Sequence, residues 1–243
     1  FMTGSSKYGY YFYDLNGKAN FTLGKKDHLY VSGYFGNDKF YFSEKNTEDN
    51  VTSKFAGGIR WGNATAVARW NHQFSPKVFG NLTTYYSRYQ FQVEAESGTE
   101  GNGTNEQFLL RFKSGISDIA ARYDIDIIPS PNHYIKTGAS VINHTYTPGA
   151  QTTKISGITG GNTDTTVGQS AIFATETDVY AEDDIKFSER LKANVGLHLA
   201  GFSVRSKFYH SIQPRLAARY LLNEKLSAKA SFVQMNQYIN LLT

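Results

Sequence analysis

Three consecutive acidic residues, Glu182, Asp183 and Asp184, form the densest group of side chains that could carry out chemistry. Paired carboxylates can act as acid and base when one of them has a raised pKa. The residues around them alternate as in a β-strand, where adjacent side chains point to opposite faces. We therefore expect Glu182 and Asp184 to share a face and Asp183 to lie on the other. The group fits a catalytic rim or, as the favoured interpretation, a hydrated wall paired with Arg and Lys.

The six histidines offer little metal-binding pattern, because no two have the close spacing of a typical metal site. There is no cysteine, which excludes a disulfide scaffold, a thiol nucleophile and a Cys-based zinc site. Gly57-Gly58 and Gly160-Gly161 lack the Lys-Ser/Thr of a phosphate loop. We expect no metal and no cofactor. His144 and His210 lie near expected outer loops, so they are the better candidates for ligand contact.

The elements that position these residues follow a period of two. From Val78 to Glu94, an apolar set that includes Phe79 and Phe91 alternates with a polar set that includes Arg88. This predicts a strand with its apolar set facing outward and Arg88 facing inward. Globular strands usually have about 5–6 residues, whereas a strand tilted across a bilayer needs roughly 9–11. The length of the alternation therefore favours a membrane β-barrel.

The same alternation recurs along the chain, and its charges share one face where helical spacing would scatter them. It predicts an all-β fold: an antiparallel transmembrane β-barrel segment of about ten long strands with short periplasmic turns and long extracellular loops. The expected strands cover residues 8–23, 29–42, 56–74, 78–94, 107–127, 134–146, 174–187, 191–204, 212–222 and 226–238.

Short polar turns alternate with longer polar stretches between these strands. The long stretches, expected to be outer loops, are Ser43–Lys54, Ala95–Glu106, Thr147–Thr175 and Arg205–Ser211. Within the third, Gln151–Gly168 is rich in Thr, Gly and Ser and is expected to be a flexible or ligand-contacting loop.

One expected strand changes phase. Phe108 and Phe112 are apolar at even positions, whereas Ile119 and Ile127 are apolar at odd positions. A bulge near Lys113–Ser117 would flip the faces. Alternatively, the upper end of the strand has left the membrane, where no lipid imposes a phase.

Composition narrows the class of protein further. Tyr and Phe, 17 of each, recur near strand ends, as in the aromatic girdles of membrane barrels; an aromatic glycan-binding face is the soluble alternative. The net charge of +4 is interspersed, which gives no indication of nucleic-acid binding. No apolar run reaches about 18 residues, so a transmembrane helix is excluded.

Several segments, taken in order, resemble a known family. They are Tyr10-Tyr11-Phe12-Tyr13-Asp14 with Asp27–Asp38, Trp61-Gly62-Asn63 with Trp70-Asn71, Thr84–Tyr89, His144–Gly149, Tyr180–Asp183 and Ser231–Leu242. Together they resemble the N-terminal part of the β-barrel of TonB-dependent outer-membrane receptors, in the branch with a carboxypeptidase-like regulatory domain.

The resemblance implies active uptake of a nutrient (an iron chelate, cobalamin or glycan) across the bacterial outer membrane. It implies a plug domain inside a 22-stranded barrel, outer-membrane lipid around it, and a TonB complex that pulls on the plug. No plug or TonB box is recognised here, so residues 1–243 are expected to be a partial barrel domain that meets its plug and its remaining strands elsewhere. The expected ligand contacts, with a small molecule or glycan, are Trp61, Arg88, His144 and His210.

Two alternatives stay open. A complete ten-stranded outer-membrane hydrolase would need acids and a His, such as Glu182 and His210, to converge at the loop rim. A soluble β-rich glycan-binding protein would need a second sheet to cover apolar faces such as Val195, Leu197 and Leu199. The family resemblance favours a receptor that is not an enzyme.

Overall fold

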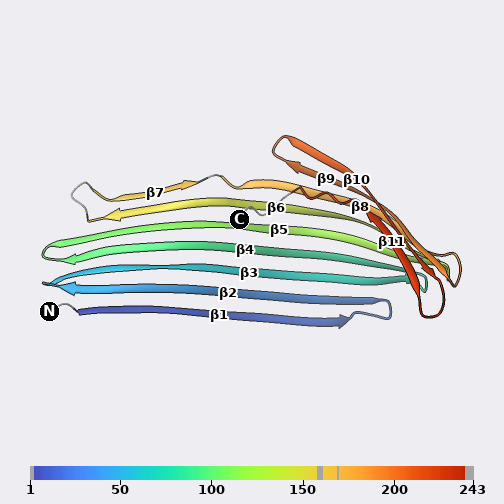
Figure 1. Cartoon of the computed structure of the whole chain (residues 1–243), viewed down its shortest axis with the longest axis horizontal. Helices are drawn as coiled ribbons and strands as arrows, with labels where there is room; N and C mark the ends of the chain where they lie inside the picture. The colour runs from blue at the N-terminus through green and yellow to red at the C-terminus, as the bar shows by residue number, and fades with distance from the viewer. Residues whose placement is uncertain (1–2, 158–160, 169, 239–243) are drawn as a thin grey trace.

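The computed structural model describes residues 3–157, 161–168 and 170–238. They form one antiparallel sheet with the order β1-β2-β3-β4-β5-β6-β8-β9-β10-β11, and β7 pairs beside β6 (Figure 1). This confirms the all-β fold and its ladder of long strands. The described residues include no helix that is long and apolar enough to cross a membrane.

The strands divide into a tall group and a short group. β1 to β6 have 20 to 27 residues each, whereas β8 to β10 have 14 or 15. The bounds are β1 Thr3–Thr22, β2 Asp27–Glu48, β3 Val51–Ser75, β4 Val78–Gly101, β5 Thr104–Ser130, β6 His133–Ser156, β7 Thr163–Gly168, β8 Ile172–Lys186, β9 Leu191–Val204, β10 Lys207–Leu221 and β11 Ser227–Val233.

The polar stretches expected to be long loops are mostly strand. β2 and β3 run to a two-residue turn at Asp49-Asn50, both with positive φ, and β4 and β5 turn at Asn102-Gly103. Such residues match the right-handed twist of a hairpin, which is why these turns close tightly. Gln151–Gly168 likewise contributes the end of β6 and all of β7, although residues 158–160 lie outside the described part. The last expected strand is shorter than predicted, since β11 ends at Val233.

The register shows which side chains share a face, because directly paired residues point to the same side. One row joins Val31, Ala68, Thr84, Ala121 and Val141 across β2 to β6. The next row toward the short turns joins Leu29, Trp70, Leu82, Tyr123 and Ala139.

We call these rows, with the row Gly33–Ala66–Tyr86–Ile119 above them, the membrane band, their apolar side the outer face, and the opposite side the inner face. On β9 the outer face carries Val195, Leu197 and Leu199, which are each 45–47% exposed. No second sheet covers them among the described residues, which removes the main support for the soluble alternative.

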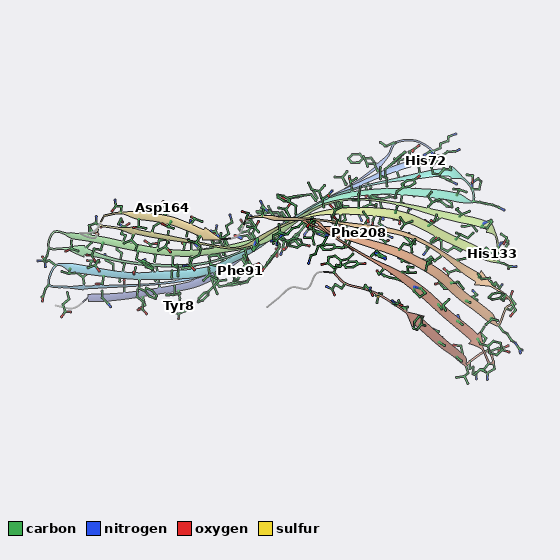
Figure 2. The ribbon with its side chains drawn as sticks, turned by 90° about the horizontal axis from the view of Figure 1, so that it is seen from above. Tyr8, His72, Phe91, His133, Asp164 and Phe208 are labelled. Atoms are coloured by element: carbon green, nitrogen blue, oxygen red, sulfur yellow. The ribbon has the colours of Figure 1, made fainter. Side chains whose placement is uncertain are left out.

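β4 extends well beyond the membrane band. Its outer face is apolar at Leu82 and Tyr86 but polar from Arg88 onward. Roughly 9–11 residues suffice to cross a bilayer, and β4 has 24. We call the parts of β1 to β6 above the row Phe35–Ala64–Arg88–Ser117 the upper wall. Figure 2 shows the sheet twisting between the upper wall, near Tyr8, Phe91 and Asp164, and the opposite end, near His72 and His133.

Face character inverts between the two parts. In the upper wall the inner face carries the rings, such as Phe40, Trp61, Phe91 and Phe112, while the outer face is mostly polar. The sequence-based orientation of residues 78–94 was therefore wrong: the set with Phe79 and Phe91 faces inward and Arg88 faces outward. The contrast between the apolar and polar sets comes mainly from the upper wall. There, no lipid selects apolar side chains for the outer face.

The same inversion explains the phase change in β5. The β4–β5 register runs unbroken from Arg88↔Ser117 to Gln92↔Lys113, so β5 contains no extra residue. A register shift does occur on the other side of β5, where Lys113 pairs with Ala150 and Gly115 with Thr147, but the extra residue belongs to β6. The strand keeps its faces and simply rises above the membrane.

Candidate functional site: the inner face

The inner face at membrane height carries a hydrogen-bonded group on β5 and β8. Arg122 Nε donates to both Asp124 oxygens at 2.8 and 2.9 Å, and the Tyr180 hydroxyl donates to Asp124 at 2.6 Å. A guanidinium nitrogen of Arg122 lies 3.3 Å from the Tyr180 oxygen. β5 and β8, which lie on either side of β6, supply these groups, and Gly138 of β6 leaves space between Asp124 and Tyr180.

Two histidines extend this polar surface. His198 stacks on Tyr180 with ring centroids 4.8 Å apart, and its Nδ1 lies 3.7 Å from Asp178. His144 Nδ1 lies 2.8 Å from Asp118. Both histidines are buried, and among the described residues their Nε2 atoms have no hydrogen-bond partner, although His144 Nε2 lies 3.7 Å from a Glu176 oxygen. Buried polar atoms are rarely left unsatisfied, so an ordered water is the expected partner of these enclosed nitrogens.

The acidic cluster divides between the two faces as the sequence predicts. Asp183 lies on the outer face and contacts His133 Nδ1 at 2.6 Å near the short turns. Glu182 and Asp184 lie on the inner face, where Asn194 donates to Asp184 at 2.9 Å.

His210 lies on the outer face of β10, opposite Gly201, whereas Glu182 lies on the inner face opposite Gly196. The two side chains therefore project from opposite sides of the sheet and cannot act on one bond. The described residues also contain no group of three or more His, Cys, Asp or Glu residues arranged to hold a metal ion. The hydrolase alternative loses its proposed pair.

Above the membrane, the inner face presents rings together with a carboxylate. The Tyr10 ring lies 6.3 Å from Trp61 and 6.0 Å from Phe12, and its hydroxyl donates to Asp38. This hydrogen bond to a carboxylate raises the pKa of Tyr10. Tyr10 and Phe12 are 54% and 63% exposed, so their faces are free for contact.

We call this surface the aromatic wall. Its members are Tyr8, Tyr10, Phe12, Asp38, Phe40, Phe42, Phe55, Ile59, Trp61, Tyr89, Phe91, Val93, Phe108, Leu110 and Phe112.

Charge is sorted between the two faces of the upper wall. Every Lys and Arg that the described part of β1 to β6 carries there projects outward. These residues are Lys7, Lys39, Lys45, Lys54, Arg60, Arg111, Lys113 and Lys154, with Arg88 in the row at the boundary. The aromatic wall thus contains an acid but no base.

At the other end of the inner face, cations form a row. Lys186, Lys192, Arg219 and Lys229 are directly paired in register across β8, β9, β10 and β11. They line a hollow of about 680 Å³ together with Asp184. Like charges that lie opposite each other on neighbouring strands destabilise a sheet. Lys186 also contacts Glu189, which leaves three cations of the row without an ion pair in the described part of the chain.

The four residues expected to contact ligand do not form one site. Trp61 and His144 lie on the inner face, whereas Arg88 and His210 lie on the outer face. Sequence reasoning missed Tyr10, Phe12 and Asp38 as companions of Trp61. Their alternation was visible, but only the register shows that three strands bring them together.

Comparison with known proteins agrees with this geometry. The family described as TonB dependent receptor-like, beta-barrel matches residues 1–234. No curated protein matches the chain.

Three solved receptors show the extent of the likeness. The ferripyoverdine receptor of the outer membrane of Pseudomonas aeruginosa, bound to ferripyoverdine, gives a TM-score of 0.53 at 9% identity, over 96% of this chain and 41% of its own. The P. aeruginosa receptor FpvA with a heterologous pyoverdine gives 0.52 at 8% identity, over 95% and 41%. The ferric preacinetobactin receptor BauA from Acinetobacter baumannii gives 0.47 at 11% identity, over 95% and 46%.

At such identities the likeness concerns the fold alone, and the chain spans less than half the length of these receptors. The family match carries more weight, because it covers nearly the whole chain and agrees with the apolar membrane band, the polar inner face and the short turns at one end. The chain therefore belongs to the β-barrel family of TonB-dependent receptors and is a protein of the bacterial outer membrane.

Proposed function

We propose that the chain forms part of the wall of a receptor that takes up a nutrient actively across the outer membrane. One observation carries the proposal: the inner face of the sheet is polar through the membrane band and aromatic above it. The outer face is apolar through the membrane band and mostly polar above it. Such a wall separates lipid from a hydrated lumen and offers ligand contacts at its outer mouth. The chemistry supported is binding and passage, not bond cleavage.

Residues 1–243 would then be a partial barrel domain. β1 and β11 do not pair with each other among the described residues, so the sheet leaves two edges. Further strands of the whole protein would close it, since unpaired edges favour aggregation. The polar inner face at membrane height would meet a plug domain, whose groups could satisfy His144, His198 and the cation row. The TonB complex would act on that plug.

The aromatic wall narrows the substrate class. An anionic iron chelate would find no Lys or Arg on the described part of this wall, and Asp38 would repel it. Rings beside a carboxylate suit a neutral, polyhydroxylated molecule, because the rings contact its apolar faces and the carboxylate accepts hydrogen bonds. Among an iron chelate, cobalamin and a glycan, we favour the glycan. The iron–pyoverdine complexes of two neighbouring receptors make a ferric chelate the competing candidate.

Trp61 is the proposed anchor of that contact, with Tyr10 and Asp38 beside it. His144 remains a prediction as a ligand contact deeper in the lumen, although its Nε2 is enclosed and lies 3.7 Å from a Glu176 oxygen. Arg88 and His210 remain predictions as ligand contacts, but their outward direction does not favour that role.

The test uses the full-length receptor and variants Trp61→Ala and Asp38→Asn, with Tyr41→Ala on the outer face of β2 as control. Binding would be measured for a panel of oligosaccharides, cobalamin and ferric chelates. We expect one oligosaccharide class to bind and Trp61→Ala to weaken it about tenfold, the loss typical of an anchoring aromatic. Tyr41→Ala should bind as the parent does. Binding of a ferric chelate alone, or equal loss in all three variants, would contradict the glycan assignment.

A further inference from the structure

Three cations on the outer face lie where the membrane band meets the upper wall. Arg88 lies in the boundary row. Arg60 and Lys113 lie on either side of Gln92, in the second row above it. They line a hollow of about 260 Å³ with Gln90 and Gln92. Gly62 and Gly115 occupy the row between them, so no side chains fill its floor on β3 and β5.

These cations have no counter-charge paired with them in the described part of the chain. None of Arg60, Arg88 and Lys113 has an ion pair or side-chain hydrogen bond in the described part of the chain. The nearest outward carboxylate above them, Glu94, is already held by Arg111 at 2.7 Å. Like charges repel each other, so the cluster favours an anion from outside the chain.

The position of the hollow indicates which anion that is. Below it, the outer face is apolar, with Ala66, Tyr86 and Ile119 in one row. Beside it, the rings of Tyr13 and Phe35 lie 5.9 Å apart and also line the hollow. Aromatic rings mark the level of lipid headgroups in membrane barrels. The hollow therefore opens sideways into the headgroup layer, away from the lumen and from any substrate there.

We propose that Arg60, Arg88 and Lys113 bind the phosphate groups of the phosphorylated glycolipid that forms the outer leaflet of the outer membrane. Arginine guanidinium groups bind phosphate through two parallel hydrogen bonds, and Lys113 supplies a point charge. Gln90 offers an amide for the sugar hydroxyls. The acyl chains would lie on the apolar outer face of β3 to β5 directly below. The site requires only that the chain lies in the outer membrane. It does not depend on which substrate the receptor takes up.

The experiment uses the full-length receptor, purified in mild detergent, delipidated, and titrated with defined glycolipids that carry two phosphates or none. The test variant is Arg60→Gln/Arg88→Gln/Lys113→Gln. The matched control is Lys7→Gln/Lys45→Gln/Lys54→Gln, which removes the same charge from the same face at higher positions. Binding would be followed by native mass spectrometry, and folding by heat-modifiable mobility.

We expect the parent and the control to bind the phosphorylated glycolipid, and the test variant to bind it about a hundredfold more weakly, at roughly fivefold per cation near an anionic surface. The dephosphorylated glycolipid should bind poorly to all three, and excess inorganic phosphate should compete weakly. Arg60→Lys/Arg88→Lys, which keeps the charge, should recover part of the affinity and serves if the triple variant misfolds. Equal loss in the control, phosphate-independent binding, or full displacement by inorganic phosphate would overturn the proposal.

Discussion

At the end of the wall with the short turns, Asp27 accepts hydrogen bonds from two residues of β3. Its Oδ1 lies 2.7 Å from His72 Nδ1 and 2.9 Å from Trp70 Nε1. The hydrogen bond with His72, and to a smaller extent the one from Trp70, holds the pKa of the Asp27 carboxyl below its ordinary value of 3.8. A depressed carboxyl pKa stabilises the fold at pH values above the unfolded pKa, and this stabilisation is lost as the pH falls through the folded value.

This group gives a pH prediction. As the pH falls below 3.8, the ordinary carboxyl pKa, Asp27 takes up a proton and the environment of Trp70 should change. The measurement is the Trp emission of the receptor during acid titration. Asp27→Asn should abolish the acid transition, while Asp14→Asn, remote from both Trp70 and His72, should retain it. A transition unchanged in Asp27→Asn would show that another group titrates.

Individual residues were predictable where a strand has a single environment. The division of Glu182 and Asp184 from Asp183 followed from alternation alone, and the register agrees. Arg88 was not predictable in the same way. Its direction depends on where β4 leaves the membrane, and alternation says which residues share a face without saying which face meets lipid.

At the scale of elements, the hairpins of the upper wall continue as paired strands far beyond the membrane. The sequence located the ten long strands, because lipid imposes a period of two on each. It did not locate their upper ends, since the polar composition of Ser43–Lys54 and Ala95–Glu106 suggested loops. The missing signal lay in the turn residues Asp49-Asn50 and Asn102-Gly103. All four have positive φ, as a tight hairpin turn requires.

The β4–β5 turn also contacts the neighbouring hairpin, which gives a prediction about both. Gly101 has φ +142°, and a Cβ there would collide with the Asn50 carbonyl oxygen and lie 2.8 Å from Val51 Cα. Gly103 has φ +83°, but nothing lies within 4 Å of its Cβ position. Gly103→Ala should therefore cost only the left-handed strain of about 1–2 kcal/mol, whereas Gly101→Ala should cost more because backbone must move.

Hydrogen exchange of the receptor distinguishes the two variants. Gly103→Ala should loosen amides near the β4–β5 turn alone. Gly101→Ala should loosen those amides and also those beside Asn50 in the β2–β3 hairpin. Identical protection patterns in the two variants would mean that the hairpins do not support each other at this point.

At the scale of the whole molecule, charge follows position in the membrane. Cations of the upper wall face outward, and the aromatic wall opposite them has no base in the described strands. Cations at the other end face inward, in the row Lys186, Lys192, Arg219 and Lys229. The inner face therefore changes from aromatic and acidic at the outer mouth to basic near the periplasm. Sequence alone could not place this row, because its four members come from four strands.

The inward cation row predicts an acidic surface on whatever fills the barrel. In Lys192→Glu/Arg219→Glu, the remaining lysines of the row would be neutralised within the wall, and an acidic plug surface would be repelled. We expect a looser plug and several-fold faster entry of a dye too large for general porins into cells that express the receptor. The matched control is Lys45→Glu/Lys54→Glu, a directly paired lysine couple on the outer face. It makes the same change in charge without touching the lumen and should leave entry unchanged. Equal entry in both variants would mean that the row faces water, and its counter-charges would then have to be free ions.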